Sequence, residues 1–236
     1  MSVPSHVSRA RLALLLGGLA MFGPFAIDTM FPAFRVIGED FAVTPVAMQQ
    51  TLSVYLIAYA LASVFHGPIS DAAGRKPVLL WGASIFALAS IGAALAQSLP
   101  QMLMFRALQG VSAGAGLIVG RAIIRDCLEG DDAQRLMSQV TMIFGIAPAV
   151  APVVGGWILA WSDWRAIFWF LVLLSMLLFA ATAFALPETH PRELRSGVRP
   201  VALFRGCAAI LREPRFLLLA FASSFNFGAL FLFIAS

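Results

Sequence analysis

Long apolar segments alternate with short polar connections along almost the whole chain. Seven segments of about 20 residues stand out, and each is long enough for a helix to cross roughly 30 Å of hydrocarbon. Their approximate bounds are residues 12–33, 48–66, 77–96, 102–124, 137–161, 166–186 and 216–236. This pattern predicts an all-α membrane protein.

The connections group the segments into two sets. Those between the first six segments are short, whereas residues 187–215 form a longer stretch rich in proline and arginine. We therefore expect a six-helix transmembrane bundle in residues 1–186, a cytoplasmic linker in 187–215, and a seventh transmembrane helix in 216–236 that begins a C-terminal bundle. The seventh segment reaches the last residue without a polar flank. We therefore expect this chain to be the first part of a longer protein.

Composition supports insertion in a lipid bilayer. Hydrophobic residues make up 60% of the chain and charged residues 12%, against about 25% charged in an average soluble domain. The formal net charge of +4 comes from cations spread over the connections. Without a basic face or neighbouring stacking aromatics, this charge does not indicate a nucleic-acid partner.

The distribution of cations predicts the orientation. If the N-terminus is cytoplasmic, Arg75, Lys76 and every arginine from Arg192 to Arg215 lie on the cytoplasmic side, whereas Arg35 and Arg165 lie on the other. This asymmetry follows the positive-inside rule. Four tryptophans flank the connection between the fifth and sixth segments, and we expect their rings to anchor at the outer interface: Trp157, Trp161, Trp164 and Trp169.

Nothing in the sequence indicates catalysis or a cofactor. Cys127 and Cys207 lie in separate connections on the predicted cytoplasmic side, so we expect neither a disulfide nor a metal site. The chain has no His/Cys cluster, Ser/His pair or phosphate-binding loop. A membrane enzyme or receptor therefore has no support, and we expect no catalytic residues.

The connection after the second segment carries a family signature. It runs from Gly67 through Asp71, Gly74, Arg75 and Lys76. Gly67 would permit close helix approach, Gly74 a tight turn, and Asp71 and Arg75 an ion pair across four positions. The spacing resembles the signature loop of the major facilitator superfamily. By that resemblance the loop is a conformational latch, which contacts the second half of the protein and holds the outward-facing state.

Two charged residues fall within apolar segments. Arg106, followed by Gln109 and Gly110, lies in the fourth segment, and Asp28 lies near the outer end of the first. A charge inside a span is costly unless it is paired or hydrated, which makes both residues functional candidates. Counting from the outer ends puts them at comparable depth, where a carboxylate can switch between paired and protonated states. An interfacial arginine and a helix-capping aspartate remain the simpler alternatives.

The fifth segment contains two prolines four residues apart. Pro148 and Pro152 each remove a backbone hydrogen bond, which predicts a kink. Together with Gly155 and Gly156 they resemble the antiporter motif of the superfamily's exporters. A kinked helix near the centre of a bundle could seal a path while the bundle rocks. This motif favours export over import.

The resemblance extends along most of the chain. The stretch from Asp28 to Pro32 is similar to the first span of bicyclomycin and chloramphenicol resistance exporters. Asp163-Trp164-Arg165 opens the sixth segment and Leu186-Pro187-Glu188-Thr189 closes it. The chain thus resembles the N-terminal half, plus one helix, of the twelve-span drug:proton antiporter family. This implies a bacterial inner (plasma) membrane protein that is monomeric when full length.

The resemblance also implies a function. It predicts a proton-coupled multidrug antiporter that exports small drug-like molecules by alternating access, in which Asp28, Arg106 and Gln109 form the proton-coupling or substrate site. Tyr55, Tyr59, Met142 and Phe144 are candidates to line a permissive pocket. The alternative is a superfamily importer, a symporter of a small metabolite. Such a protein should carry more polar residues within its spans than this chain does.

Overall fold

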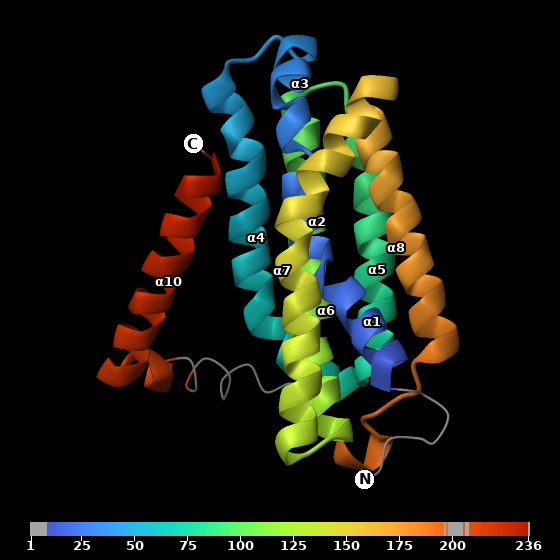
Figure 1. Cartoon of the computed structure of the whole chain (residues 1–236), viewed down its shortest axis with the longest axis vertical. Helices are drawn as coiled ribbons and strands as arrows, with labels where there is room; N and C mark the ends of the chain where they lie inside the picture. Colours follow the sequence, from blue (N-terminus) through green and yellow to red (C-terminus); the bar gives the residue numbers. More distant parts are fainter. Residues whose placement is uncertain (1–8, 196, 198–204, 206–207, 236) are drawn as a thin grey trace. The chain divides into compact units, whose positions relative to one another are not determined.

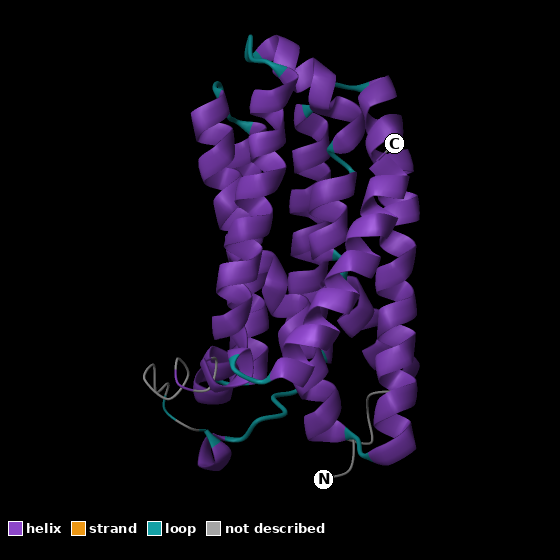
Figure 2. Cartoon of the chain, turned by 90° about the vertical axis from the view of Figure 1, so that its left-hand side faces the viewer, coloured by secondary structure: helices purple, strands orange, loops and turns teal. Residues whose placement is uncertain are grey.

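The computed structural model describes residues 9–195, 197, 205 and 208–235. These residues are helical apart from short connections, and no strand occurs among them (Figure 2). The chain divides into two compact units, Met1–Ser196 and Gly197–Ser236. The expectation of an all-helical chain is confirmed.

The first unit is a bundle of long helices that lie side by side (Figure 1). Helices α1, α5 and α7 begin at the lower end of the bundle in this view, and α4, α6 and α8 end there. The elements are α1 (Arg9–Ala20), α2 (Phe22–Asp28), η1 (Phe31–Ala33), α3 (Phe34–Asp40), α4 (Pro45–Ala73), α5 (Arg75–Ala94), α6 (Leu99–Cys127), α7 (Gly130–Trp161), α8 (Arg165–Ala185) and η2 (Arg192–Leu194).

The long helices coincide with the predicted spans. Among the described residues, five helices are long and apolar enough to cross a membrane, and the bent pair Arg9–Ala20 and Phe22–Asp40 would make a sixth. The two members of this pair meet at an angle of 42°. Pro24 explains the break, because it has no N–H to donate to the carbonyl of Ala20.

The helices also extend beyond the apolar segments. The second predicted span, 48–66, lies within α4, which runs from Pro45 to Ala73. Its first turn is fixed by Thr44, whose hydroxyl accepts a hydrogen bond from the Ala47 N–H at 3.2 Å, and by proline at the next position. Gly74, with φ of 102°, ends it. Hydropathy indicates which part of a helix is apolar enough to cross the membrane, whereas caps and turn residues set the ends of the helix.

Helix α6 occupies the centre of the bundle and contacts α1, α2, α4, α5 and α7. Two of its glycines explain how close the neighbours come. A Cβ added at Gly110 would collide with the carbonyl of Tyr55 on α4, and one added at Gly116 with the carbonyl of Leu19 on α1. Small residues let the backbones touch, which maximises packing where lipid offers no hydrophobic driving force.

The helices differ in how far their apolar faces are covered. In the most apolar stretch of α5 and of α6, 56% of the residues are buried, against 6% in α4 and 17% in α7. Helices α5 and α6 are therefore interior elements of this unit. Helices α4 and α7 present most of their apolar residues at its surface.

The tryptophan prediction is wrong for one of the four residues. Trp157, Trp161 and Trp169 are exposed, in keeping with interfacial anchors, but Trp164 is 2% exposed. Its ring packs edge-on against Phe168, and its Nε1 donates to Asp40 Oδ2 at 3.1 Å. A tryptophan whose N–H finds a protein acceptor can be buried entirely.

The second unit contains α10 (Pro214–Ala235), which corresponds to the predicted seventh span. Within the expected linker, residues 196, 198–204 and 206–207 lie outside the described part. Residues 187–195 belong to the first unit, where Glu188 and Thr189 bond to its lower end.

Candidate functional site

Asp28 is the last residue of α2, and its side chain is buried at 6% exposure. The expected ion pair with Arg106 is not formed. No hydrogen bond or ion pair of the Asp28 carboxylate occurs in the described part of the chain. A carboxylate with so little exposure and no partner is costly in its charged form, because its hydration is reduced without compensation.

Arg106 on α6 is also buried, at 1% exposure, and it is held by neutral groups. Its Nη1 donates to the carbonyl of Ala26 and to Gln109 Oε1, both at 2.8 Å. The guanidinium carbon lies 4.4 Å from the centroid of the Tyr55 ring, a cation–π contact. Arg106 therefore bonds to the backbone of α2 two residues before Asp28, rather than to the Asp28 carboxylate.

The hydrogen bonds continue from Arg106 into α5. Gln109 Nε2 donates to Ser90 Oγ at 2.8 Å, and the Ser90 hydroxyl donates to the carbonyl of Phe86 at 2.7 Å. Ser90, Gln109 and Tyr55 are all fully buried. We call Tyr55, Ser90, Arg106 and Gln109 the polar core. It links α2, α4, α5 and α6 at the centre of the bundle.

Helix α7 packs on the same part of α2. Ala147, Ala151 and Gly155, spaced four residues apart, are buried along one of its faces. A Cβ added at Gly155 would collide with the backbone of Thr29, the residue after Asp28. Pro148 and Pro152 lie inside α7, which nevertheless remains one helix. Gly156 has open space around it. The proline-containing helix thus contacts the chain directly next to Asp28.

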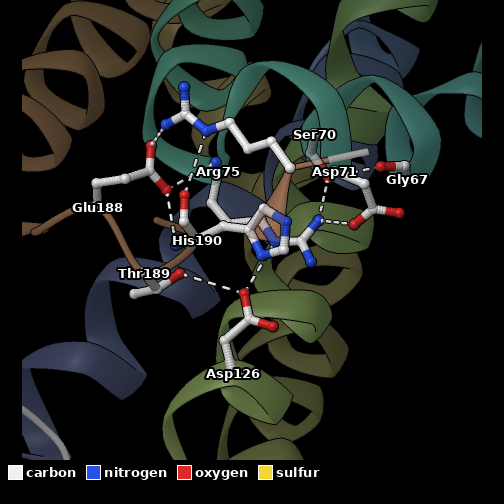
Figure 3. A network of polar contacts seen from close by, with 9 residues as sticks. Gly67, Ser70, Asp71, Arg75, Asp126, Glu188, Thr189 and His190 are labelled. Atoms are coloured by element: carbon white, nitrogen blue, oxygen red, sulfur yellow. Dashed lines mark hydrogen bonds and ion pairs between the residues drawn. The ribbon is translucent and has the colours of Figure 1, made fainter. Parts of the chain in front are cut away.

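The predicted latch loop lies at the lower end of the bundle, where it forms a dense set of polar contacts (Figure 3). Arg75 pairs with Asp71 as predicted, although Gly74 separates α4 from α5 between them. Its Nε also bonds to Asp126 Oδ2 at the end of α6, at 2.9 Å, and its Nη1 donates to Ser70 Oγ at 2.6 Å. Arg75 thereby joins the ends of α4, α5 and α6.

Three further residues of the loop have separate roles. Gly74 has φ of 102°, which confirms the predicted tight turn. Lys76 Nζ donates to the carbonyl of Ala183 at the end of α8, at 2.7 Å. Among the described residues, a Cβ added at Gly67 would meet nothing within 4 Å, so the close helix approach expected there stays a prediction.

The segment after α8 closes over the loop. Glu188 Oε1 accepts the backbone N–H of Arg75 at 2.9 Å, and Thr189 Oγ1 bonds to Asp126 Oδ2 at 3.4 Å (Figure 3). Glu188 Oε2 pairs with Arg195 Nη2 at 3.5 Å. We call Ser70, Asp71, Arg75, Asp126 and Glu188 the latch network.

A metal centre is not among the features of this region. No group of three or more His, Cys, Asp or Glu side chains in the described ranges could hold a metal ion. Cys127 is a free thiol, and Cys207 lies outside those ranges.

Comparison with known proteins identifies the family of this chain. The profile of the Major Facilitator Superfamily matches residues 13–236. The chain belongs to this superfamily. The bicyclomycin resistance protein homolog of Haemophilus influenzae is 34% identical over 223 residues, which are 94% of this chain and 56% of that protein. Multidrug resistance protein D of Escherichia coli is 34% identical over 180 residues, 76% of this chain and 46% of that protein.

Solved superfamily structures share the fold. The proton:xylose symporter XylE covers 90% of this chain with a TM-score of 0.69 and 14% sequence identity, and the match spans 56% of that chain. This chain therefore spans about half the length of the relatives it matches. Its polar core and latch network both lie within this half of a superfamily protein.

The sequence analysis gave no role to four participants, one of which is Ser70 within the signature loop itself. Asp126 follows Arg125 at the end of the fourth span, Glu188 belongs to the motif that closes the sixth, and Ser90 is an ordinary residue of the third. Asp126 and Glu188 had a weak signal, because an acidic residue at a basic membrane face invites pairing. Ser90 had none, because only the packing of α5 on α6 brings it to Gln109.

Proposed function

We propose that the full-length protein is a multidrug antiporter, which exports small drug-like molecules across the bacterial inner membrane in exchange for protons. The N-terminus and the latch network would face the cytoplasm. The observation that carries this proposal is the buried, unpartnered carboxylate of Asp28, one residue from the contact between Thr29 and Gly155 of α7.

Two events would lower the free-energy cost of burying the charged Asp28 carboxylate. A proton neutralises the carboxylate, and a cationic or strongly polar group of a substrate compensates its charge. These events compete for one side chain, which is the requirement for exchange in opposite directions. Because α7 contacts the adjacent residue, a change of charge at Asp28 would alter the packing of the proline-containing helix.

The polar core supplies a fixed frame for this switch. Arg106 bonds to the backbone of α2 through the Ala26 carbonyl, so it positions the helix end without neutralising Asp28. Gln109 accepts a second hydrogen bond from the same Nη1 of the guanidinium and is itself held by Ser90. The latch network would hold the lower end closed in the outward-facing state. The relatedness at 34% identity to drug-resistance proteins supports export as the direction.

The test uses the full-length protein in everted membrane vesicles. Addition of drug should release protons from wild-type vesicles, and Asp28→Asn should abolish this release because the amide cannot carry a proton. Asp131→Asn, a matched change at an exposed residue of α7, should leave the release unchanged. Normal exchange by the Asp28→Asn variant would assign proton coupling to another residue. Accumulation of a labelled metabolite with no drug resistance would favour the importer instead.

A further inference from the structure

We propose that Glu188 is a positioning residue of the latch network. It holds the start of α5 and thereby keeps the Arg75 side chain directed at Asp71 and Asp126. The contribution to transport rests on the proposed alternating-access function, whereas the positioning itself can be measured without transport. The motif Leu186-Pro187-Glu188-Thr189, which closes the sixth span, would thus help to position the latch loop between the second and third spans.

The first step of the argument is the end of α5. Arg75 is the first residue of this helix, and its N–H has no acceptor within the helix. A side chain at the N-cap accepts from the second or third N–H of a helix rather than from the first, and the N-cap here is Gly74, which has no side chain, so the acceptor for Arg75 must come from elsewhere in the fold. Glu188 supplies it from 113 positions along the chain, at 2.9 Å. A carboxylate is a favourable acceptor here, because the N-terminus of a helix carries partial positive charge.

The second step is the space above Gly74. A Cβ added to this glycine would collide with the Glu188 carboxylate and the Arg195 guanidinium. Gly74 therefore has two roles: it allows the turn of the backbone, and it leaves room for the Glu188–Arg195 pair. Glu188 occupies a place that the loop leaves open for it.

The third step is the fold of the segment that carries Glu188. Glu188 Oε1 also accepts the backbone N–H of His190 at 3.0 Å, and Arg195 Nε donates to the His190 carbonyl at 3.3 Å. Thr189 adds the bond to Asp126. The segment is thus wrapped around the carboxylate that it presents to Arg75 (Figure 3).

These contacts fix Arg75 at both ends. Its backbone is held by Glu188, and its side chain is held by Asp71 on α4 and Asp126 on α6. Release of the backbone would let the start of α5 fray and would weaken both ion pairs. The position of the latch would therefore depend on the segment that leads from α8 out of the bundle.

The experiment measures the conformational equilibrium of the full-length protein. Spin labels on opposite sides of the predicted cytoplasmic face report its open and closed populations. Glu188→Ala should raise the ratio of open to closed about 5- to 30-fold, the effect of losing a helix cap and its charge. Glu188→Gln keeps an acceptor without the charge and should give a smaller rise. Glu193→Gln, at an exposed residue of η2, should give none.

Amide hydrogen exchange distinguishes positioning from general stability. In Glu188→Gln the first turn of α5 should exchange faster while the other helices keep wild-type protection. Loss of protection throughout the bundle, or a distance distribution equal to that of Glu193→Gln, would overturn the inference. If the distances shift as expected but the wild type exchanges no protons for drug, the proposed function fails and the role of Glu188 stands.

Discussion

Arg106 shows how single side chains accommodate a charge inside a transmembrane bundle. Its Nε and Nη1 donate to carbonyl oxygens and an amide oxygen, and the guanidinium lies over an aromatic ring, with no carboxylate among these groups. Such hydrogen bonds and the cation–π contact offset part of the cost of burying the charge. The Asp28 carboxylate nearby has no partner among the described residues, and this difference separates a structural cation from a candidate proton carrier.

The polar core predicts the cost of losing one hydroxyl. Ser90→Ala would remove the acceptor of Gln109 Nε2 and leave a buried amide unpaired, so we expect the free energy of unfolding to fall by about 1–3 kcal/mol. Ser53→Ala removes an exposed hydroxyl that bonds its own helix and should change stability little. Thermal unfolding in detergent would compare the two. Equal midpoints would show that Ser90 does not support Gln109.

Two glycines with positive φ give a second residue-scale prediction. Gly74→Ala should destabilise the protein by more than the roughly 1–2 kcal/mol typical of such a change, because the added methyl would also displace Glu188 and Arg195. Gly130→Ala, at φ of 55° with open space around it, should lower the free energy of unfolding only through the strain of a positive φ. Thermal unfolding of both variants measures the difference. A smaller effect at Gly74 would contradict the close contact with Glu188.

At the scale of elements, the contact between α7 and α2 decides what the prolines can do. The two prolines loosen the helix, but a face of small residues keeps it against α2. At Gly155 the two backbones touch. A helix that is both weakened and tightly seated can shift as a unit when the neighbouring carboxylate changes its charge.

This contact predicts a large effect from one methyl group. Gly155→Ala would push α7 away from Thr29, so we expect drug-induced proton release by the full-length protein to fall at least about tenfold, the effect of 1.4 kcal/mol on a rate. Gly145→Ala, on the same helix with nothing within 4 Å, should transport normally. Vesicle assays at equal protein levels give the comparison. Full activity of the Gly155→Ala variant would show that the close contact between α7 and Thr29 is not needed for exchange.

The elements also show where sequence patterns lose resolution. The first apolar segment predicted one span, and the structure bends it at Met21, where the carbonyl of Ala20 lacks the N–H that Pro24 cannot supply. Trp164 was expected at the interface, but its ring is buried, where it bonds to Asp40 and packs against Phe168. Periodicity describes an average environment, whereas the environment of one ring depends on which residues the fold brings beside it.

At the scale of the whole molecule, the described unit carries its sites at two levels. The polar core lies at the centre of the bundle, and the latch network lies at its lower end, where α4, α5 and α6 meet the segment after α8. Helices α4 and α7 leave most of their apolar residues incompletely buried. These surfaces are available to lipid or to the part of a full-length relative that this chain does not span.

The half-length match predicts that the present chain does not transport alone. Since it spans about half of its relatives, we expect residues 1–236 expressed in membranes to show no drug-induced proton release, whereas a full-length form does. Co-expression with the remaining half of such a form should restore part of the activity. Transport by residues 1–236 alone at the full-length rate would contradict this prediction.

The sequence by itself determined the membrane class, the positions of the spans and the candidate residues within them. Span length and hydropathy are local properties, and a charge in an apolar segment is conspicuous wherever the segment packs. The family motifs likewise depend on spacing along the chain. For these reasons Asp28, Arg106 and the Asp71–Arg75 pair could be named before the fold was known.

Only the tertiary structure decided which of these residues meet. Arg106 bonds to the Ala26 carbonyl instead of Asp28, because its reach is set by how α6 packs on α2. Glu188 caps α5 from 113 positions away. Such contacts depend on the relative placement of helices, which is fixed by the glycines at which their backbones touch and by the caps that end them. Hydropathy carries no information on either, so the partners of each charged residue follow from the packed bundle alone.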